Sequence, residues 1–319
     1  MRNRVLTRLV AFAASLVIAT LAIFWVTSAL PGDIAQILLG TNATPGEAAA
    51  LRAQLGLDRP WIVQYLDWVA GLVTGDLGTS MRDGSPVGAE IAGKFAVTGW
   101  LVGFGMFWAM VIAVPLGAFA AVKRRRWSGF AASAVSQIGL SVPAFWLGIL
   151  LVLLFAVRLR WLPANGYVPL RTDATQWAAH LVLPVLALAV VQASVLSRYV
   201  RSAVIEVLGE DWFRTARAVG WSQGGALLRH GTRNVGLSVI TVLGLQLSTL
   251  LVGAIIIEQV FALPGLGSLL LNAVSLRDLS LVRGIVFVLV SSVLVLNLAI
   301  DLAYLLIDPR LRRDQAVAE

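Results

Sequence analysis

The residue types that carry chemistry in most enzymes are scarce in this 319-residue sequence. It contains no cysteine and two histidines, His180 and His230, so thiol nucleophiles, cysteine-ligated zinc and iron–sulfur clusters are excluded. The segment Gly88–Lys94 matches the first part of the phosphate-binding pattern G-x-x-x-x-G-K, but Phe95 follows where that pattern needs Ser or Thr for magnesium. No H-E-x-x-H or G-x-S-x-G segment is present either. We therefore expect no catalytic residue, no metal, no cofactor and no ATP site in this chain.

The composition indicates that the remaining polar residues are positioned by membrane helices. Hydrophobic residues make up 58% of the sequence and charged residues 13%, against about 25% charged in soluble domains. Apolar runs of about 20 residues, the length that crosses a bilayer, predict an all-α integral membrane protein. Its six spans are Leu9–Leu30, Phe95–Val122, Gly129–Val157, Ala178–Ser197, Val235–Ile257 and Ile285–Ile307.

The basic residues predict how these spans are oriented. Lys and Arg gather in the N-terminal tail, in the turn Lys123–Arg126, in the loop from Arg198 to Asn234 and in the C-terminal tail. The positive-inside rule places these segments in the cytoplasm, with both termini inside. The net charge of +8 therefore reflects topology, not nucleic-acid binding. The N-terminus resembles a secretory signal, but its apolar run exceeds the 7–15 residues of such signals, so we predict a first span.

The spans divide the chain into three parts. Residues 1–30 form the tail and first span, residues 31–94 an extracytoplasmic loop domain, and residues 95–319 a core that includes the cytoplasmic loop 198–234.

The extracytoplasmic loop contains the pattern of a short helix. Pro45–Leu55 is preceded by Thr44 as N-cap and has Glu47 in its first turn. Aromatic residues then recur at helical spacing: Trp61, Tyr65 and Trp68. These segments form either a packed cap over the helices or a surface for a soluble partner.

The loop from Arg198 to Asn234 differs sharply in composition from its flanking spans. We predict three short helices in it: Ala203–Leu208, Asp211–Val219 and a third between Ser222 and His230.

Small residues in the second of these helices and directly after it suggest a docking surface. Ala216 and Gly220 are four positions apart, which predicts one flat helical face, with Arg214 and Arg217 at its rim. Such a face suits a groove on another protein. The alternative is an ordinary basic loop.

Several polar residues lie at membrane depth, where they either line a solute pathway or form interhelical hydrogen bonds. They are Gln137, Ser141, Gln192, Gln246, Ser248, Thr249 and Asn297. Two carboxylates also lie at span ends. Glu258, near an outer edge, is a candidate gate or partner for a substrate amine; like Asp301, it can instead snorkel or pair with arginine.

Motifs along nearly the whole chain resemble one family of membrane proteins. Each is weak alone, but their order and spacing are specific: Leu30–Asp33, Gly75–Ser80, Ser141–Trp146, Trp161–Tyr167, Glu206–Leu208, Glu210–Gly220, Arg229–His230, Arg233–Asn234, Glu258–Phe261, Pro264–Gly267, Arg277–Asp278, and Asp301 with Tyr304 and Asp308–Arg310. Together they resemble ATP-binding-cassette (ABC) importer permeases of the dipeptide/oligopeptide/nickel family, first-permease branch.

The resemblance implies a type I ABC-importer permease in the bacterial plasma membrane, driven by separate ATPases. Its implied partners are a second homologous permease, two cytoplasmic ABC ATPases and an extracytoplasmic substrate-binding protein. The ATPase-coupling residues it implies are Glu210, Asp211, Arg214, Thr215, Ala216, Arg217, Ala218 and Gly220, and the candidate gate comprises Glu258, Pro264, Gly265 and Gly267.

The implied solute is a short peptide, with nickel chelates and glutathione as alternatives. Two other classes are less well supported. A self-sufficient secondary transporter needs ionisable residues near mid-membrane, and a membrane-embedded enzyme needs a catalytic constellation.

Three positions depart from the family pattern. Val219 stands where the family commonly has Lys, Ser238 stands where a Pro begins the fifth span, and Arg214 stands where more distant importers carry Glu.

Overall fold

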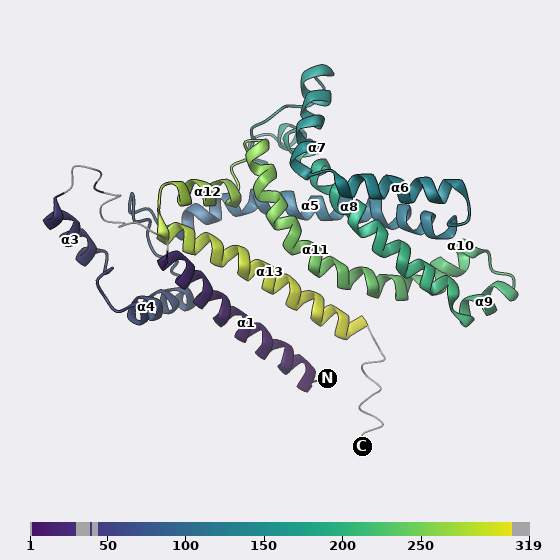
Figure 1. Ribbon diagram of the computed structural model, residues 1–319, viewed down its shortest axis with the longest axis horizontal. Helices are drawn as coiled ribbons and strands as arrows, with labels where there is room; N and C mark the ends of the chain where they lie inside the picture. Colours follow the sequence, from purple (N-terminus) through teal and green to yellow (C-terminus); the bar gives the residue numbers. More distant parts are fainter. Residues whose placement is uncertain (1, 30–38, 40–43, 308–319) are drawn as a thin grey trace. The chain divides into compact units, whose positions relative to one another are not determined.

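A computed structural model of the chain describes residues 2–29, 39 and 44–307. Within these residues every extended regular element is a helix (Figure 1). These residues divide into two compact units, one formed by Thr98–Leu263 with the described residues after 295 and the other by the described residues up to 97 with Pro264–Val295. Each unit is described by itself.

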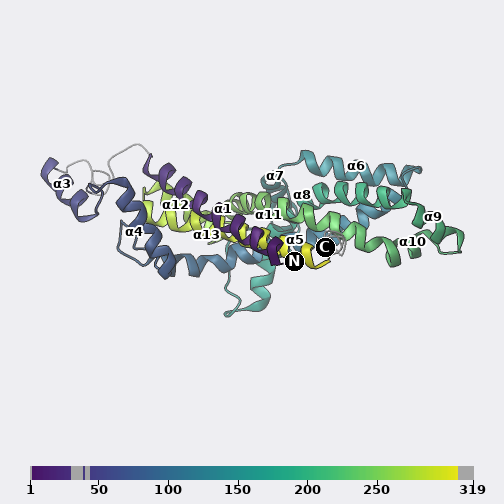
Figure 2. The same cartoon turned by 90° about the horizontal axis from the view of Figure 1, so that it is seen from below.

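The first unit is built around α8 (Ala174–Gly209) and α11 (Thr232–Val260), which pack extensively on one another. Helix α6 (Trp127–Ser141) lies along α8, as Figures 1 and 2 show. Their approach depends on Gly139, because a Cβ there would lie 2.0 Å from Ser194 Oγ. Gly117 of α5 (Val87–Val122) has a similar role, since its Cβ would lie 2.5 Å from the Ser197 carbonyl oxygen.

The third predicted span is broken. After α6 the chain bends by 99° and continues as α7 (Ala144–Leu151) and the π-helical segment η1 (Val152–Arg158). Pro143 causes the break, because it has no N–H to donate and forces the preceding residue out of the helical region. Val142 accordingly adopts φ −96° and ψ 118°. The predicted span Gly129–Val157 is therefore formed by two helical segments with a break at Val142–Pro143, not by one continuous helix.

The other five spans are present as long apolar helices, with different bounds. They are α1 (Arg2–Ser28), α5, α8, α11 and α13 (Leu279–Ile307). The predicted separate helix Ala203–Leu208 is wrong, because these residues form the end of α8. Buried Val200, Val204 and Val207 continue its apolar face, so nothing interrupts the helix before Gly209.

The second unit contains α1, the first turns of α5, α12 (Leu266–Ser275), most of α13 and two outer helices, α3 (Pro45–Gln54) and α4 (Trp61–Thr74). Phe24 of α1 contacts both Tyr65 and Trp68, at centroid distances of 5.5 and 6.1 Å. These two aromatic residues thus pack on α1, as the packed-cap interpretation expects, while Trp61 is exposed.

Two local features of this unit agree with the sequence. Thr44 and Glu47 form a reciprocal capping box at the start of α3. The segment Gly88–Lys94, which imitates a phosphate-binding loop, lies within the first turns of α5 and is helical.

Candidate functional site

The predicted coupling segment is an eight-residue helix, α9 (Asp211–Ala218). Gly220 follows with φ +101°, a conformation that glycine adopts without a Cβ penalty and that commonly ends helices. The chain restarts at α10 (Gln223–Ala226), where the Ser222 hydroxyl accepts a hydrogen bond from the Gly225 N–H at 3.1 Å. It continues through the π-helical segment η2 (Leu227–Gly231) into α11. The predicted stop at Gly220 and restart after Ser222 are confirmed.

One side of α9 is anchored in the first unit. Phe213 is only 4% exposed and belongs to a buried cluster that includes Val204 and Val207 of α8, Ala226 of α10 and Val235 of α11. The α9 side chains Trp212 and Ala216 pack partly against this cluster. A displacement of α9 is therefore mechanically linked to α8 and α11.

The opposite side of α9 is exposed. It carries Arg214, Thr215 and Ala218. Arg214 forms an exposed ion pair with Asp211 at 3.4 Å, which contributes little stability. Arg217 Nη1 donates a hydrogen bond to the Trp221 carbonyl oxygen at 2.6 Å and so links α9 to the next turn.

The flat face predicted from Ala216 and Gly220 is not formed. Ala216 is half-buried against the core cluster, and Gly220 lies outside the helix, which ends at Ala218. The exposed surface available to a partner is instead formed by Arg214, Thr215 and Ala218, together with Glu210 and Asp211 at the start of the helix.

The polar residues at membrane depth have different surroundings. Gln246 Nε2 donates to Gln192 Oε1 at 2.7 Å, and both side chains are buried. Ser141 and Thr249 bond carbonyl oxygens of their own helices, and Gln137 is exposed. The structure thus joins Gln192 to Gln246 as an interhelical pair.

Two further candidates of this set, Ser248 and Asn297, are half-buried. Asn297 Oδ1 lies 3.2 Å from where a Cβ on Gly244 would be.

Glu258 lies deeper than expected. Its side chain is 0% exposed and accepts a hydrogen bond from Thr98 Oγ1 at 2.6 Å. Of the alternatives considered for Glu258, snorkelling to a membrane edge is excluded, because α5 and the surrounding core cover its side chain. Thr98 was not identified from the sequence as the hydrogen-bond partner of Glu258. Its hydroxyl group within an apolar span is the feature that could have indicated this role.

The other gate candidates follow Glu258 along the chain. Pro264 and Gly265 precede α12, and Gly267 is buried in its first turn. The structure assigns these three residues to the second unit and Glu258 to the first. Asp301 is half-buried in α13.

A polar cluster in the second unit was also missed. Asp278 is 3% exposed and accepts hydrogen bonds from the Ser80 hydroxyl, the Met81 N–H and the Leu281 N–H. It therefore caps α13 and fixes the loop around Ser80. The motifs Gly75–Ser80 and Arg277–Asp278 are brought together in this way.

A buried arginine in the same unit joins α13 to α1. Arg283 Nε donates to Thr27 Oγ1 at 2.8 Å, and its guanidinium lies 4.4 Å from the centroid of the Phe24 ring.

Comparison with known proteins gives matches along nearly the whole chain. Residues 113–313 match the family model described as "Binding-protein-dependent transport system inner membrane component", and residues 1–98 match its N-terminal counterpart. The glutathione transport system permease protein GsiC of Salmonella typhi is 40% identical over 312 residues, covering 98% of this chain and 99% of that protein. GsiC of Escherichia coli K12 is 38% identical over the same length and coverage.

Proposed function

Because this chain belongs to the family of inner-membrane components of binding-protein-dependent transport systems, we propose that it moves short peptides as one half of a heterodimeric permease. The chain is the permease subunit of an ABC importer in the bacterial inner membrane, and it is a transporter rather than an enzyme. ATPase subunits and a substrate-binding protein act with it. The second permease, the two copies of the ATPase and the peptide substrate belong to the proposal.

One observation supports the coupling role of α9. Its exposed side presents Arg214, Thr215 and Ala218, while Phe213 on the other side is packed among α8, α10 and α11. A partner protein that binds the exposed side of α9 can therefore displace α8 and α11, because Phe213 connects α9 to these helices. ATP-driven closure of two ATPases would draw α9 and its counterpart on the second permease together and change which side of the membrane the pathway faces.

The solute is proposed from the named relatives. Glutathione is itself a tripeptide, so a glutathione-type solute and a short peptide share a backbone amide, a carboxylate and an amine. We propose substrates of this class.

We also propose how the chain is oriented across the membrane. Lys123–Arg126, α9 and both termini are cytoplasmic, while α3 and α4 lie on the other side of the membrane. The unequal distribution of Lys and Arg between alternate loops supports this arrangement.

The coupling role can be tested by site-directed cross-linking, since the natural chain contains no cysteine. Ala218→Cys places a single thiol on the exposed end of α9. In the complete importer, reconstituted in proteoliposomes with its ATPases and binding protein, a maleimide–benzophenone reagent is attached to the thiol of Ala218→Cys and then irradiated. We expect the benzophenone, which inserts into C–H bonds and needs no partner thiol, to join this position to an ATPase subunit. Ala50→Cys, exposed on α3, is the matched control and should not cross-link.

The same two variants test the orientation. In right-side-out membrane vesicles, a membrane-impermeant maleimide should label Ala50→Cys directly and Ala218→Cys only after the membrane is opened. Cross-linking at α3, or labelling of Ala218→Cys from outside, would contradict the proposed topology and coupling surface.

Transport itself is measured as uptake of radiolabelled glutathione and of a labelled dipeptide into these proteoliposomes. We expect uptake that requires ATP and persists after ion gradients are collapsed. Uptake without the ATPases would instead identify a secondary transporter.

A further inference from the structure

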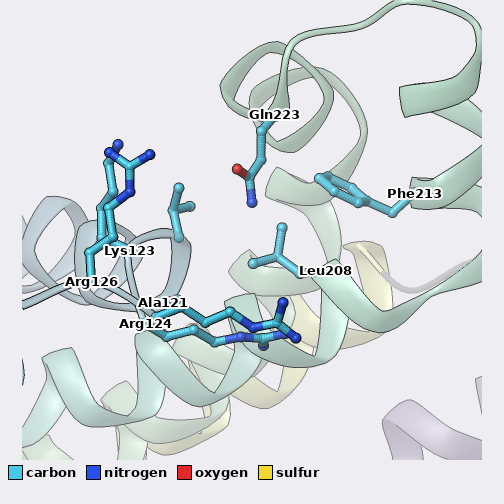
Figure 3. Close-up of a pocket in the computed structure, with 9 residues that line it drawn as sticks. Ala121, Lys123, Arg124, Arg126, Leu208, Phe213 and Gln223 are labelled. Atoms are coloured by element: carbon cyan, nitrogen blue, oxygen red, sulfur yellow. The ribbon is translucent and has the colours of Figure 1, made fainter. Parts of the chain in front are cut away.

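A pocket of the first unit lies beside the base of α9. It has a volume of about 280 Å³ and is lined by the turn Lys123–Arg126 between α5 and α6, by Leu208 at the end of α8, by Phe213 and by Gln223. Figure 3 shows the Gln223 amide and the Phe213 ring directed into this space, with Lys123 and Arg126 along one side and Arg124 along another. The pocket thus joins four cationic side chains to an amide donor and an apolar wall.

The charges in the pocket are not neutralised within the described part of the chain. No carboxylate lines the pocket, and no ion pair among the described residues involves residues 123–126. The turn is tight, since the Arg126 N–H donates to the Lys123 carbonyl oxygen at 2.8 Å. Four like charges held this closely repel one another, and an anion in the pocket would relieve that repulsion.

The basic turn that lines the pocket lies at the end of an apolar span. The turn directly follows the apolar helix α5. Next to it, Trp127 and Phe130 stack at 5.0 Å and are 79% and 59% exposed. Exposed aromatic rings at the end of a span are typical of the membrane–water interface.

We propose that this pocket binds the phosphate group of an anionic phospholipid. Guanidinium groups of the turn offer paired N–H donors that match phosphate oxygens, and the Gln223 amide can donate a further hydrogen bond. Leu208 and the Phe213 ring provide an apolar surface for the glycerol and the upper acyl chain. These apolar walls and the interfacial position favour a lipid over a free phosphate ion, which has no apolar part.

This inference goes beyond the proposed function, because lipid binding needs neither ATPase nor substrate. A bound headgroup would touch both the α5–α6 turn and Phe213, the residue that anchors α9. It would therefore stabilise α9 against displacement from the core.

The test measures binding of dioleoylphosphatidylglycerol to the purified full-length chain in detergent by native mass spectrometry, with dioleoylphosphatidylcholine as the neutral lipid. Arg124→Gln with Arg126→Gln removes two pocket cations and leaves Lys123 and Arg125 to preserve topology. Since hydrogen bonds to charged groups are the strong ones, we expect phosphatidylglycerol to bind this variant about tenfold more weakly.

The matched control removes the same charge elsewhere. Arg198→Gln with Arg229→Gln changes two exposed arginines that do not line the pocket, and binding should stay within about twofold of the wild type. An equal loss in both double variants would mean general attraction to basic charge and would overturn the site. If the pocket variant unfolds, Arg124→Gln and Arg126→Gln are measured singly, each with an expected loss of about threefold.

Two further measurements distinguish a lipid phosphate group from a soluble anion and from a contact with the partner protein. Inorganic phosphate in excess should leave phosphatidylglycerol bound, and displacement by phosphate would identify a soluble-anion site instead. Unchanged lipid binding, with reduced co-purification of the ATPase subunits by the pocket variant, would mean that the turn contacts the partner protein. Either result overturns the lipid site, and neither bears on whether the importer moves peptides.

Discussion

Helices α3 and α9 are both short, both carry an acidic residue in the first turn, and both lie outside the apolar spans, but they are held differently. Helix α3 is stabilised at its N-terminus by its capping box, and Ala48 is its buried residue. Helix α9 has no side-chain hydrogen bond at its N-cap, Glu210, and buries Phe213 in the core cluster. The conformation of α3 is thus fixed by its own sequence, whereas α9 is fixed by packing. A helix that transmits movement requires the second arrangement.

The largest expected effect comes from removing the anchor of α9. Phe213→Ala leaves a cavity among α8, α10 and α11, and such truncations cost about 3–5 kcal/mol in a well-packed core. We expect a lower thermal unfolding midpoint and nearly complete loss of ATP-driven uptake. Leu51→Ala, at a half-buried position of α3, is the control and should leave uptake near the wild-type rate. Normal uptake by Phe213→Ala would show that α9 does not act through this anchor.

A smaller effect is expected at the turn that ends α9. Gly220 has φ +101°, and no described atom outside its neighbours lies within 4 Å of its ideal Cβ. Gly220→Ala therefore introduces backbone strain alone, of about 1–3 kcal/mol. We expect less cross-linking of the α9 thiol to the ATPase.

Gly224→Ala is the matched control for that strain. Gly224 lies in α10, its φ is not positive, and its Cβ also meets no atom within 4 Å. The substitution should be neutral or slightly stabilising, because alanine favours the helix. Equal effects of the two substitutions would mean that the turn geometry at Gly220 is unimportant.

Features set by neighbouring residues could be predicted from the sequence. The capping box of α3 and the end of α9 at Gly220 depend on residues within a few positions of each other. The bend at Pro143 depends on a local signal as well, but the apolar run continues on both sides of it, and hydropathy alone treats the run as one span.

Features that join distant residues could not be predicted in the same way. Thr98 bonds Glu258 across 160 positions, and Ser80 bonds Asp278 across 198. The sequence shows that each of these polar residues is present. Which of them form hydrogen bonds with one another depends on how the helices pack. Ala216 was misplaced for the same reason, since helical spacing defines a face without saying whether that face points inward or outward.

A more modest effect is expected at the cap of α3. Thr44→Ala removes the side chain that accepts the Glu47 N–H hydrogen bond at 3.3 Å, and losing such a cap costs about 1 kcal/mol. We expect a spin label on Ala50→Cys to become more mobile while ATP-driven uptake is unchanged. The label on Ala218→Cys should be unaffected. Loss of uptake would mean that α3 is coupled to the core after all.

The smallest effect is a pH dependence of α3. Hydrogen bonds from the Thr44 backbone and then its hydroxyl hold the pKa of Glu47 below its ordinary value of 4.5. A carboxyl group whose pKa is lowered by folding stabilises the folded form above its unfolded pKa, and this contribution is lost as the pH falls through the folded pKa. The label on Ala50→Cys should therefore become more mobile as the pH falls below about 4.5.

Two matched measurements test the origin of this transition. Glu47→Gln should abolish it, because glutamine can complete a capping box without titrating. The label on Ala218→Cys should show a much smaller change in this range, because the packing of Phe213 holds α9 and the exposed Asp211–Arg214 ion pair contributes little stability. A shared transition in α3 and α9 would contradict the distinction between a locally capped helix and one anchored in the core.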